Sequence, residues 1–345
     1  MTLALPRRWL ASVATVALVA AGFVLTTPAG PAQAAVPDVF AFVLWNGAVV
    51  GSGTTPSSTI VTPGSAGQYK ITFPGKAGKG VAHVTAINSV PHWCQLASFN
   101  PAGPDEVLVV NCYRVGGVPD NTAFSAIFDS STGPISGPGA FGYVNALPSG
   151  GLVSQYNSSG ATNVVTPGLT GQWTVNLPGL ATPTGVYGSL QATAVSPQVP
   201  ARCKVTSWTS GTGQSVQVAC YTSSGSPFNT QFTLSYQYQR SLYGGALPPK
   251  FFAYLWTGGA AGASPTSYNS NGGLNTYTTG PITPVGFPLM GAAPDDVQVT
   301  ATGPSPDFCG LATSWTPSTN ARVNCFTPGG TPVADPFLIS YNSAV

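Results

Sequence analysis

Charged side chains are scarce in this chain of 345 residues: Asp, Glu, Lys and Arg make up 6% of it, against about 25% in an ordinary soluble domain. A nucleic-acid-binding protein needs a basic face that neutralises phosphates, so the composition excludes that class. The sequence also has no Cys-x-x-Cys, no Gly-x-x-x-x-Gly-Lys-Ser/Thr and only two histidines, so the usual zinc and nucleotide motifs are missing. We therefore expect no cofactor and no metal. Hydrophobic residues, at 43%, are still sufficient to build a folded core.

Residues 1–34 have the composition of a secretory signal peptide. Arg7 and Arg8 form a basic start, Trp9–Leu25 carries no charge, and Ala32-Gln33-Ala34 offers a small-x-small cleavage site. Cleavage there lowers the basic count from 11 to 9 while the acidic count stays at 9, so the mature chain has no net charge. The apolar run is shorter than the roughly 18–20 residues that a membrane span needs, and no later run is long enough. We expect a secreted, extracellular protein without a membrane span.

Internal repetition organises the remaining sequence. The six cysteines fall into three pairs, and the same residue types follow the second cysteine of each pair at the same offsets. These are an aromatic residue directly after it, a proline at seven, a phenylalanine at twelve and an aromatic residue at sixteen: Tyr113, Pro119, Phe124 and Phe128; Tyr221, Pro227, Phe232 and Tyr236; Phe326, Pro332, Phe337 and Tyr341. We infer three modules, at residues 35–137, 138–246 and 247–345, and call them repeats 1, 2 and 3.

Alternation of apolar and polar residues with a period of two predicts β-strands in every repeat. Leu108, Val110 and Cys112 share one face of such a strand, and equivalent residues do so in the other repeats. Gly-, Pro- and Ser-rich turns separate the strands, and no helical period follows the signal segment. We predict an all-β fold of three tandem antiparallel β-sandwich (immunoglobulin-like) modules. Each module should close its own core with one disulfide: Cys94–Cys112, Cys203–Cys220 and Cys309–Cys325.

The pattern Thr-Ala…Cys…Ser-Trp…Val-x-Val-x-Cys-Tyr/Phe-x-x-x-Gly-x-Pro…Phe-x-x-x-Tyr resembles a two-cysteine tandem β repeat of exported actinobacterial proteins of unassigned function. The likeness covers nearly all of the chain after the signal segment and is best in repeat 2. Repeat 1 lacks the Tyr-Asn-Ser stretch that begins at Tyr156 and Tyr268 in the other two repeats. The resemblance implies export and architecture, and no chemistry.

Candidate catalytic groups lie outside the repeated pattern. Asp105-Glu106 and Asp295-Asp296 each precede a strand, where adjacent carboxylates point apart, whereas a glycosidase needs two that face each other about 5–10 Å apart. We expect solvated turns there. His83 and His92, with Asp105, could in principle form a metal site or a Ser-His-Asp relay. Repeats 2 and 3 contain no histidine, and no Gly-x-Ser-x-Gly occurs, so we expect ordinary surface or half-buried histidines.

The remaining candidate is a ligand-binding site without charged residues, in loops where tyrosine alternates with small polar residues. The weak candidates for ligand binding are Tyr156, Asn157, Asn163, Tyr268, Asn269 and Asn275. The competing interpretation is hairpin-turn chemistry, in which Asn and Gly adopt positive φ. Trp208 and Trp315 follow a core cysteine closely, so we expect buried rings rather than a ligand platform.

These observations favour a secreted, non-catalytic structural or adhesive protein. The first alternative is a lectin-like protein that binds carbohydrate and gains avidity from repetition. The second alternative is an extracellular hydrolase or protease inhibitor confined to one repeat. The expected partners are an extracellular glycan or a cell-envelope protein, with no nucleic acid.

Overall fold

The described part of the chain is all-β. The computed structural model describes residues 38–52, 58–135, 139–180, 182, 185–244, 251–291, 293–315 and 320–344. The predicted signal peptide lies outside the described residues. Within them there is no α-helix, and one short 3₁₀ turn, η1, spans Val115–Gly117.

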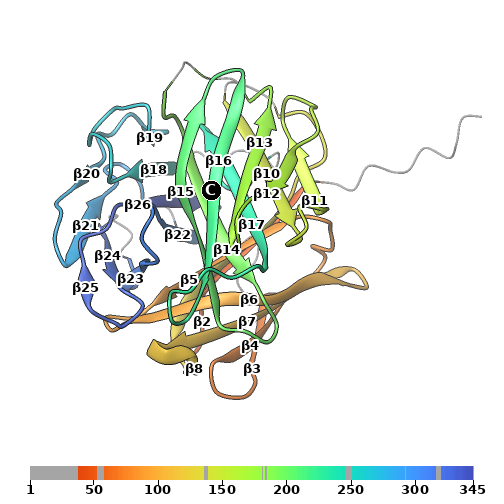
Figure 1. Ribbon diagram of the computed structural model, residues 1–345, viewed down its shortest axis with the longest axis vertical. Coiled ribbons are helices and arrows are strands. Elements are labelled where there is room, and N and C mark those ends of the chain that lie inside the picture. The colour runs from red at the N-terminus through yellow and green to blue at the C-terminus, as the bar shows by residue number, and fades with distance from the viewer. Residues whose placement is uncertain are drawn as a thin grey trace, which may run out of the picture. The chain divides into compact units, whose positions relative to one another are not determined.

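Figure 1 shows the strands, which are given below by the residue ranges named repeats 1, 2 and 3 in the sequence analysis. Repeat 1 contains β1 (Val39–Trp45), β2 (Val49–Ser52), β3 (Ile60–Pro63), β4 (Gln68–Phe73), β5 (Val81–Ile87), β6 (His92–Ala102), β7 (Asp105–Arg114), β8 (Val118–Pro119) and β9 (Ala123–Ser130). Repeat 2 contains β10 (Ala140–Ala146), β11 (Leu152–Asn157), β12 (Val164–Pro167), β13 (Gln172–Pro178), β14 (Ser189–Val195), β15 (Ala201–Ser210), β16 (Gly213–Thr222) and β17 (Gln231–Tyr238). Repeat 3 contains β18 (Phe252–Trp256), β19 (Ser267–Asn269), β20 (Thr276–Tyr277), β21 (Ile282–Gly286), β22 (Asp295–Ala301), β23 (Phe308–Thr313), β24 (Asn320–Phe326), β25 (Pro332–Val333) and β26 (Phe337–Ser343).

Two of the four sheets cross the boundaries between repeats. One runs β2-β1-β9-β5-β23-β24-β21-β20 and joins repeat 1 to repeat 3, with β25 beside β24. Another runs β11-β10-β17-β14-β6-β7-β4-β3 and joins repeat 2 to repeat 1, with β8 beside β7. The remaining sheets, β12-β13-β16-β15 and β19-β18-β26-β22, each lie within one repeat. The repeats therefore share sheets.

The junctions between repeats use equivalent residues in cyclic order. Ile87 lies opposite Leu311, Val195 opposite Leu96, and Thr302 opposite Val205, each in a parallel pair or bridge. In each case the next backbone N–H donates to the carbonyl of that partner: Asn88 to Leu311 at 2.7 Å, Ser196 to Leu96 at 2.8 Å and Gly303 to Val205 at 3.1 Å. Repeat 1 thus contacts repeat 3, repeat 3 contacts repeat 2, and repeat 2 contacts repeat 1. The prediction of purely antiparallel sheets is wrong at these junctions, because the strand ends meet in the parallel sense.

The alternation predicted from the sequence determines the apolar cores. In β7, Leu108, Val110 and Cys112 are fully buried, as are Phe124 and Phe128 in β9. The opposite face of β9 is also buried, although it carries polar side chains. The same holds for the equivalent strands β17 and β26. These strands have one apolar face inside their own repeat and one polar face against the other repeats.

Each disulfide joins the two cysteines that the repetition pairs. The bonds are Cys94–Cys112, Cys203–Cys220 and Cys309–Cys325. In every pair the cysteines lie directly opposite each other on neighbouring antiparallel strands. The bridge therefore braces one sheet, whereas the bridge of an immunoglobulin domain joins two sheets.

Candidate functional site

The three repeats meet through a buried layer of polar side chains. Its members come from two equivalent positions on β5, β14 and β22, occupied by His83, Gln191 and Gln298 at the first position and by Thr85, Thr193 and Thr300 at the second. Thr85 donates to Gln298 Oε1 at 2.9 Å, Thr300 donates to Gln191 Oε1 at 2.8 Å, and Thr193 Oγ1 lies 3.1 Å from His83 Nδ1. The pairs run around the repeats in the same cyclic order as the backbone junctions.

His83 is a structural member of this layer. Its Nε2 lies 2.8 Å from Ser235 Oγ in repeat 2, and the side chain is 2% exposed. Burial lowers the pKa of His83 to about 3, because the charged imidazolium is penalised away from water. The ring is therefore neutral at physiological pH and joins two repeats by hydrogen bonds.

A buried carboxyl lies beside the layer. Ser125 of repeat 1 donates to Asp296 Oδ1 at 2.6 Å, and Gln298 Nε2 donates to the same oxygen at 2.8 Å. Burial raises the pKa of Asp296 to about 7, against the lowering effect of these two hydrogen bonds. The expected solvated turn is wrong at this position, because Asp296 is fully buried and Asp295 nearly so.

The other acidic pair is divided between surface and interior. Asp105 accepts a hydrogen bond from the Gly75 N–H at 2.9 Å. Glu106 is fully buried, and its Oε2 accepts from the Gly78 N–H at 3.3 Å. Burial raises the pKa of Glu106 to about 8. The expectation of a solvated turn is therefore wrong for Glu106.

His92 forms a pair with a carboxylate that the sequence did not connect to it. Its Nε2 lies 3.1 Å from Asp120 Oδ2, and its Nδ1 lies 3.3 Å from the Val90 carbonyl. The Arg114 guanidinium also approaches Asp120, at 3.7 Å. Both ring nitrogens of His92 thus have partners that are not nucleophiles, so the pair lacks the serine that a relay requires. Among the described residues, no group of three or more His, Cys, Asp or Glu side chains is placed to hold a metal ion.

Three equivalent residues, each directly before the first cysteine of its repeat, stack on one another. The Arg202 Cζ lies over the rings of Trp93 and Phe308, 4.6 and 4.3 Å from their centroids, and the two rings contact each other edge to face at 5.5 Å. Its Nη2 donates to the carbonyls of Thr222 and Ser223, both at 3.2 Å. Burial lowers the pKa of Arg202 to about 10, so it remains charged. The cation is stabilised by two aromatic faces.

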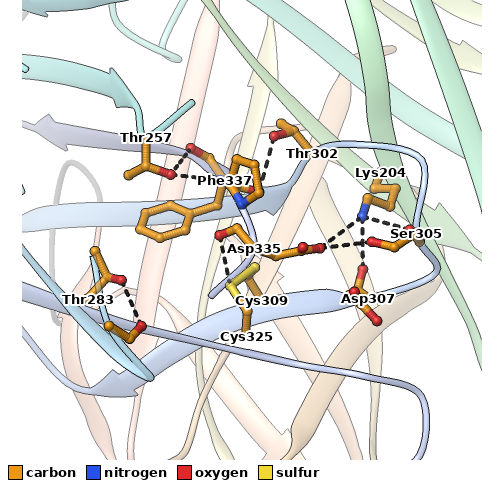
Figure 2. The surroundings of a disulfide bond; sticks show 12 residues. Lys204, Thr257, Thr283, Thr302, Ser305, Asp307, Cys309, Cys325, Asp335 and Phe337 are labelled. Carbon is orange, nitrogen blue, oxygen red and sulfur yellow. Dashed lines mark hydrogen bonds and ion pairs between the residues drawn. A yellow bond between two sulfur atoms is a disulfide. The ribbon is translucent and has the colours of Figure 1, made fainter. Parts of the chain in front are cut away.

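The residue after the first cysteine ties neighbouring repeats together. Lys204 is 3% exposed, and its Nζ donates to the Ser305 carbonyl at 2.8 Å and lies 3.7 Å from Asp335 (Figure 2). Gln95 is the equivalent residue of repeat 1 and makes the same kind of contact with neutral groups. Its Nε2 donates to the Ser196 carbonyl, and its Oε1 accepts from the Ala201 N–H, both at 2.6 Å. A charged and a neutral side chain therefore serve equivalent positions at two different junctions.

The four asparagines proposed for ligand binding are turned inward. Asn157 donates to Asn163 Oδ1 at 2.8 Å and to the Pro178 carbonyl at 2.9 Å. Asn163 donates to the carbonyls of Tyr143 and Tyr156. Asn269 and Asn275 repeat the arrangement in the third repeat, where they bond to each other at 3.1 Å and to backbone carbonyls. These contacts give the asparagines a structural role, whereas the positive φ of the turn interpretation is adopted by Gly160 and Gly272 and not by the asparagines. Trp208 and Trp315 are buried, as predicted.

The two tyrosines of those candidate stretches lie in equivalent grooves at successive junctions. Tyr156 lies against residues 131–134, and its hydroxyl donates to the Gly133 carbonyl at 2.5 Å. Tyr268 lies in a groove of about 340 Å³ together with Tyr187, Tyr238 and Tyr254. Only the second groove is rich in aromatic residues. Tyr187 and Tyr238 could not be predicted from the repeated pattern, because the residues at these two positions differ between the repeats.

Comparison with family models, curated proteins and solved structures finds no match for this chain. No helix in the described ranges has the length and apolar character needed to cross a membrane.

Proposed function

We propose that the protein is a secreted, non-catalytic structural or adhesive protein, in which three immunoglobulin-like β-sandwich modules close on one another as a single rigid body. Three disulfides support a location in an oxidising compartment. The layer between the repeats supports the closed arrangement, since its contacts follow one cyclic order.

One observation carries the non-catalytic part of the proposal. The reactive side chains that could serve acid/base chemistry are used as structural groups: His83 joins two repeats, Asp296 anchors Ser125, and Glu106 holds the Gly78 N–H. Catalysis needs such groups within reach of a substrate. A protein with few charged side chains is instead suited to filling or cross-linking an extracellular layer.

The test compares binding and turnover on the same material. Purified protein is incubated with isolated cell envelope, and we measure both the bound fraction and the release of soluble sugars, peptides or acyl groups. We expect retention without release. Release that disappears in His92→Ala or Asp105→Ala, and persists in the surface variant Asp38→Asn, would contradict the proposal.

A further inference from the structure

The aromatic groove between repeats 2 and 3 is not a requirement of the fold. Tyr187 and Tyr238 stand at positions that Lys79 and Ser130 occupy at the first junction, counted from the equivalent glycines Gly80 and Gly188 and from the end of the last strand. The groove at the first junction contains the equivalent Tyr156 but is lined by residues 131–134 and 155–161, and its lining includes neither Lys79 nor Ser130. The additional tyrosines therefore belong to this groove alone and not to the shared architecture.

The rings are arranged in two pairs, in which Tyr187, Tyr238 and Tyr268 are half-buried and Tyr254 is buried behind Tyr268. Tyr187 and Tyr238 meet edge to face, with centroids 6.2 Å apart. Tyr254 and Tyr268 lie nearly parallel at 5.9 Å. Such a lining presents both ring faces and ring edges to a ligand in the groove.

The groove is held rigidly by backbone contacts across the junction. The Gly188 N–H donates to the Pro265 carbonyl at 2.9 Å, and the Gln239 N–H donates to the Tyr254 hydroxyl at 3.1 Å. Gly188 has φ +76°, and a Cβ there would meet the Gln237 carbonyl oxygen at 2.5 Å, so only glycine fits beside Tyr187. Gln239 also has positive φ, at 49°, which is uncommon for a non-glycine residue. A site that is already ordered loses less free energy on binding.

One hydroxyl group at the groove, that of Ser264, lacks a protein partner within the described ranges. The hydroxyl oxygen is buried, although Ser264 lines the groove. A buried hydroxyl without a hydrogen-bond partner is unfavourable, so a ligand that supplies the missing hydrogen bond gains from it. Among the described residues, no charged side chain lines the groove.

We propose that the groove formed by Tyr187, Tyr238, Gln239, Tyr254, Ser264 and Tyr268 binds a neutral, hydroxyl-rich glycan. The apolar C–H faces of sugar rings pack on the tyrosine rings, and sugar hydroxyls bond to Ser264 and Gln239. A ligand without charge fits a lining without charge. Its volume, about 340 Å³, lies at the lower end of the range for small-molecule sites, so the groove accommodates a short segment of a longer chain.

The test is affinity electrophoresis of the full chain through gels that contain one neutral polysaccharide each: a linear α-glucan, a β-glucan or a mannan. We expect one of these polymers to retard the protein. Tyr238→Ala and Tyr268→Ala should each weaken that retardation about tenfold, the effect expected for losing one stacked ring. Tyr156→Ala is the matched control, because it removes the equivalent tyrosine from the first groove, and it should leave retardation unchanged. Thermal unfolding midpoints of all variants identify any that fail to fold, and Tyr238→Phe then tests the position with the ring retained.

Three results would overturn the inference: no retardation by any of the polymers, retardation insensitive to both groove variants, or an equal loss in Tyr156→Ala. Binding of an oligoproline peptide that is lost in Tyr238→Ala, without glycan binding, would also overturn it and assign the groove to peptide. The inference is independent of the proposed structural role. Envelope retention that survives Tyr238→Ala would leave that role intact while removing the glycan site.

Discussion

Asp296 should make the protein less stable as the pH rises from 4 to 7. Its pKa is about 7 in the folded protein and 3.8 without the fold. A carboxyl whose pKa is raised by folding binds its proton more tightly in the folded state, so its contribution is fully present below pH 4 and is lost as the pH rises through about 7.

The magnitude follows from that difference. One pKa unit corresponds to about 1.4 kcal/mol, so the full loss is about 4 kcal/mol, with a slope of about 1.4 kcal/mol per pH unit. This is a large part of the roughly 5–15 kcal/mol that stabilises a typical domain. The value is an upper limit, since the ionised protein can relax or admit water around the carboxylate.

The assay is urea unfolding between pH 4.5 and 8.5, followed by the fluorescence of the buried Trp173 and Trp208. Asp296→Asn retains an oxygen that accepts from Ser125 and Gln298, and it does not titrate. The free energy of unfolding of the parent should therefore fall relative to this variant up to pH 7 and then level off. His83 acts in the opposite sense, because its pKa is lowered to about 3 and its contribution is lost as the pH falls below 6.5, but it cancels in the comparison.

Asp105→Asn is the control, because it removes a carboxylate from the surface end of the other acidic pair. A parent and an Asp296→Asn variant whose stabilities differ by a constant amount across this range would refute the reasoning. So would an equal change of slope in Asp105→Asn.

Three further predictions concern contacts that stabilise the fold, one between repeats and two within repeat 2. Lys204→Gln should cost less stability than Lys204→Ala in urea unfolding, because Gln95 shows that a neutral amide can make the equivalent junction; equal losses would contradict this. Asn163→Ala should lower the free energy of unfolding by about 2–3 kcal/mol, because it removes three buried side-chain hydrogen bonds, two to carbonyls and one from Asn157, and it should leave polysaccharide retardation unchanged. The double variant Cys203→Ser/Cys220→Ser should lose about 3 kcal/mol on the chain-entropy estimate for a 17-residue loop; calorimetry that finds no loss would argue against it.

The sequence was sufficient to predict the all-β class and the cysteine pairs, because both depend on features that every repeat shares. Alternation placed Leu108, Val110 and Cys112 on one buried face, as the structure has them. The second buried layer could not be predicted in the same way. Ser125 and Ser235 occupy the polar face of their strands, and a small hydroxyl suits a water-exposed face as well as a hydrogen-bonded junction.

The prediction of solvated turns at the acidic pairs is wrong for a related reason. Glu106 follows Asp105 in a strand, so one of the two must point inward, and the alternation itself indicated which side was the core. The charge of Glu106 predicts a solvent-exposed side chain, because isolated buried carboxyls are rare, whereas its position in the alternation predicts a buried one. The residues that differ between repeats carried the remaining information. Trp93, Arg202 and Phe308 each directly precede the first cysteine of their repeat. The three residue types differ, which indicates that the three side chains contact one another and are not interchangeable.

That difference explains what a single chain can do that three identical chains cannot. A symmetric trimer places the same residue at each equivalent position around its axis. Three copies of Arg202 would bring buried like charges together, and three copies of Trp93 would crowd the space that one arginine now fills beside two contacting rings. Covalent linkage of the repeats removes the symmetry requirement, so one cation can be placed beside two aromatic side chains. The same freedom allows tyrosines to gather at the second junction only, where Tyr187 and Tyr238 replace a lysine and a serine without disturbing the first.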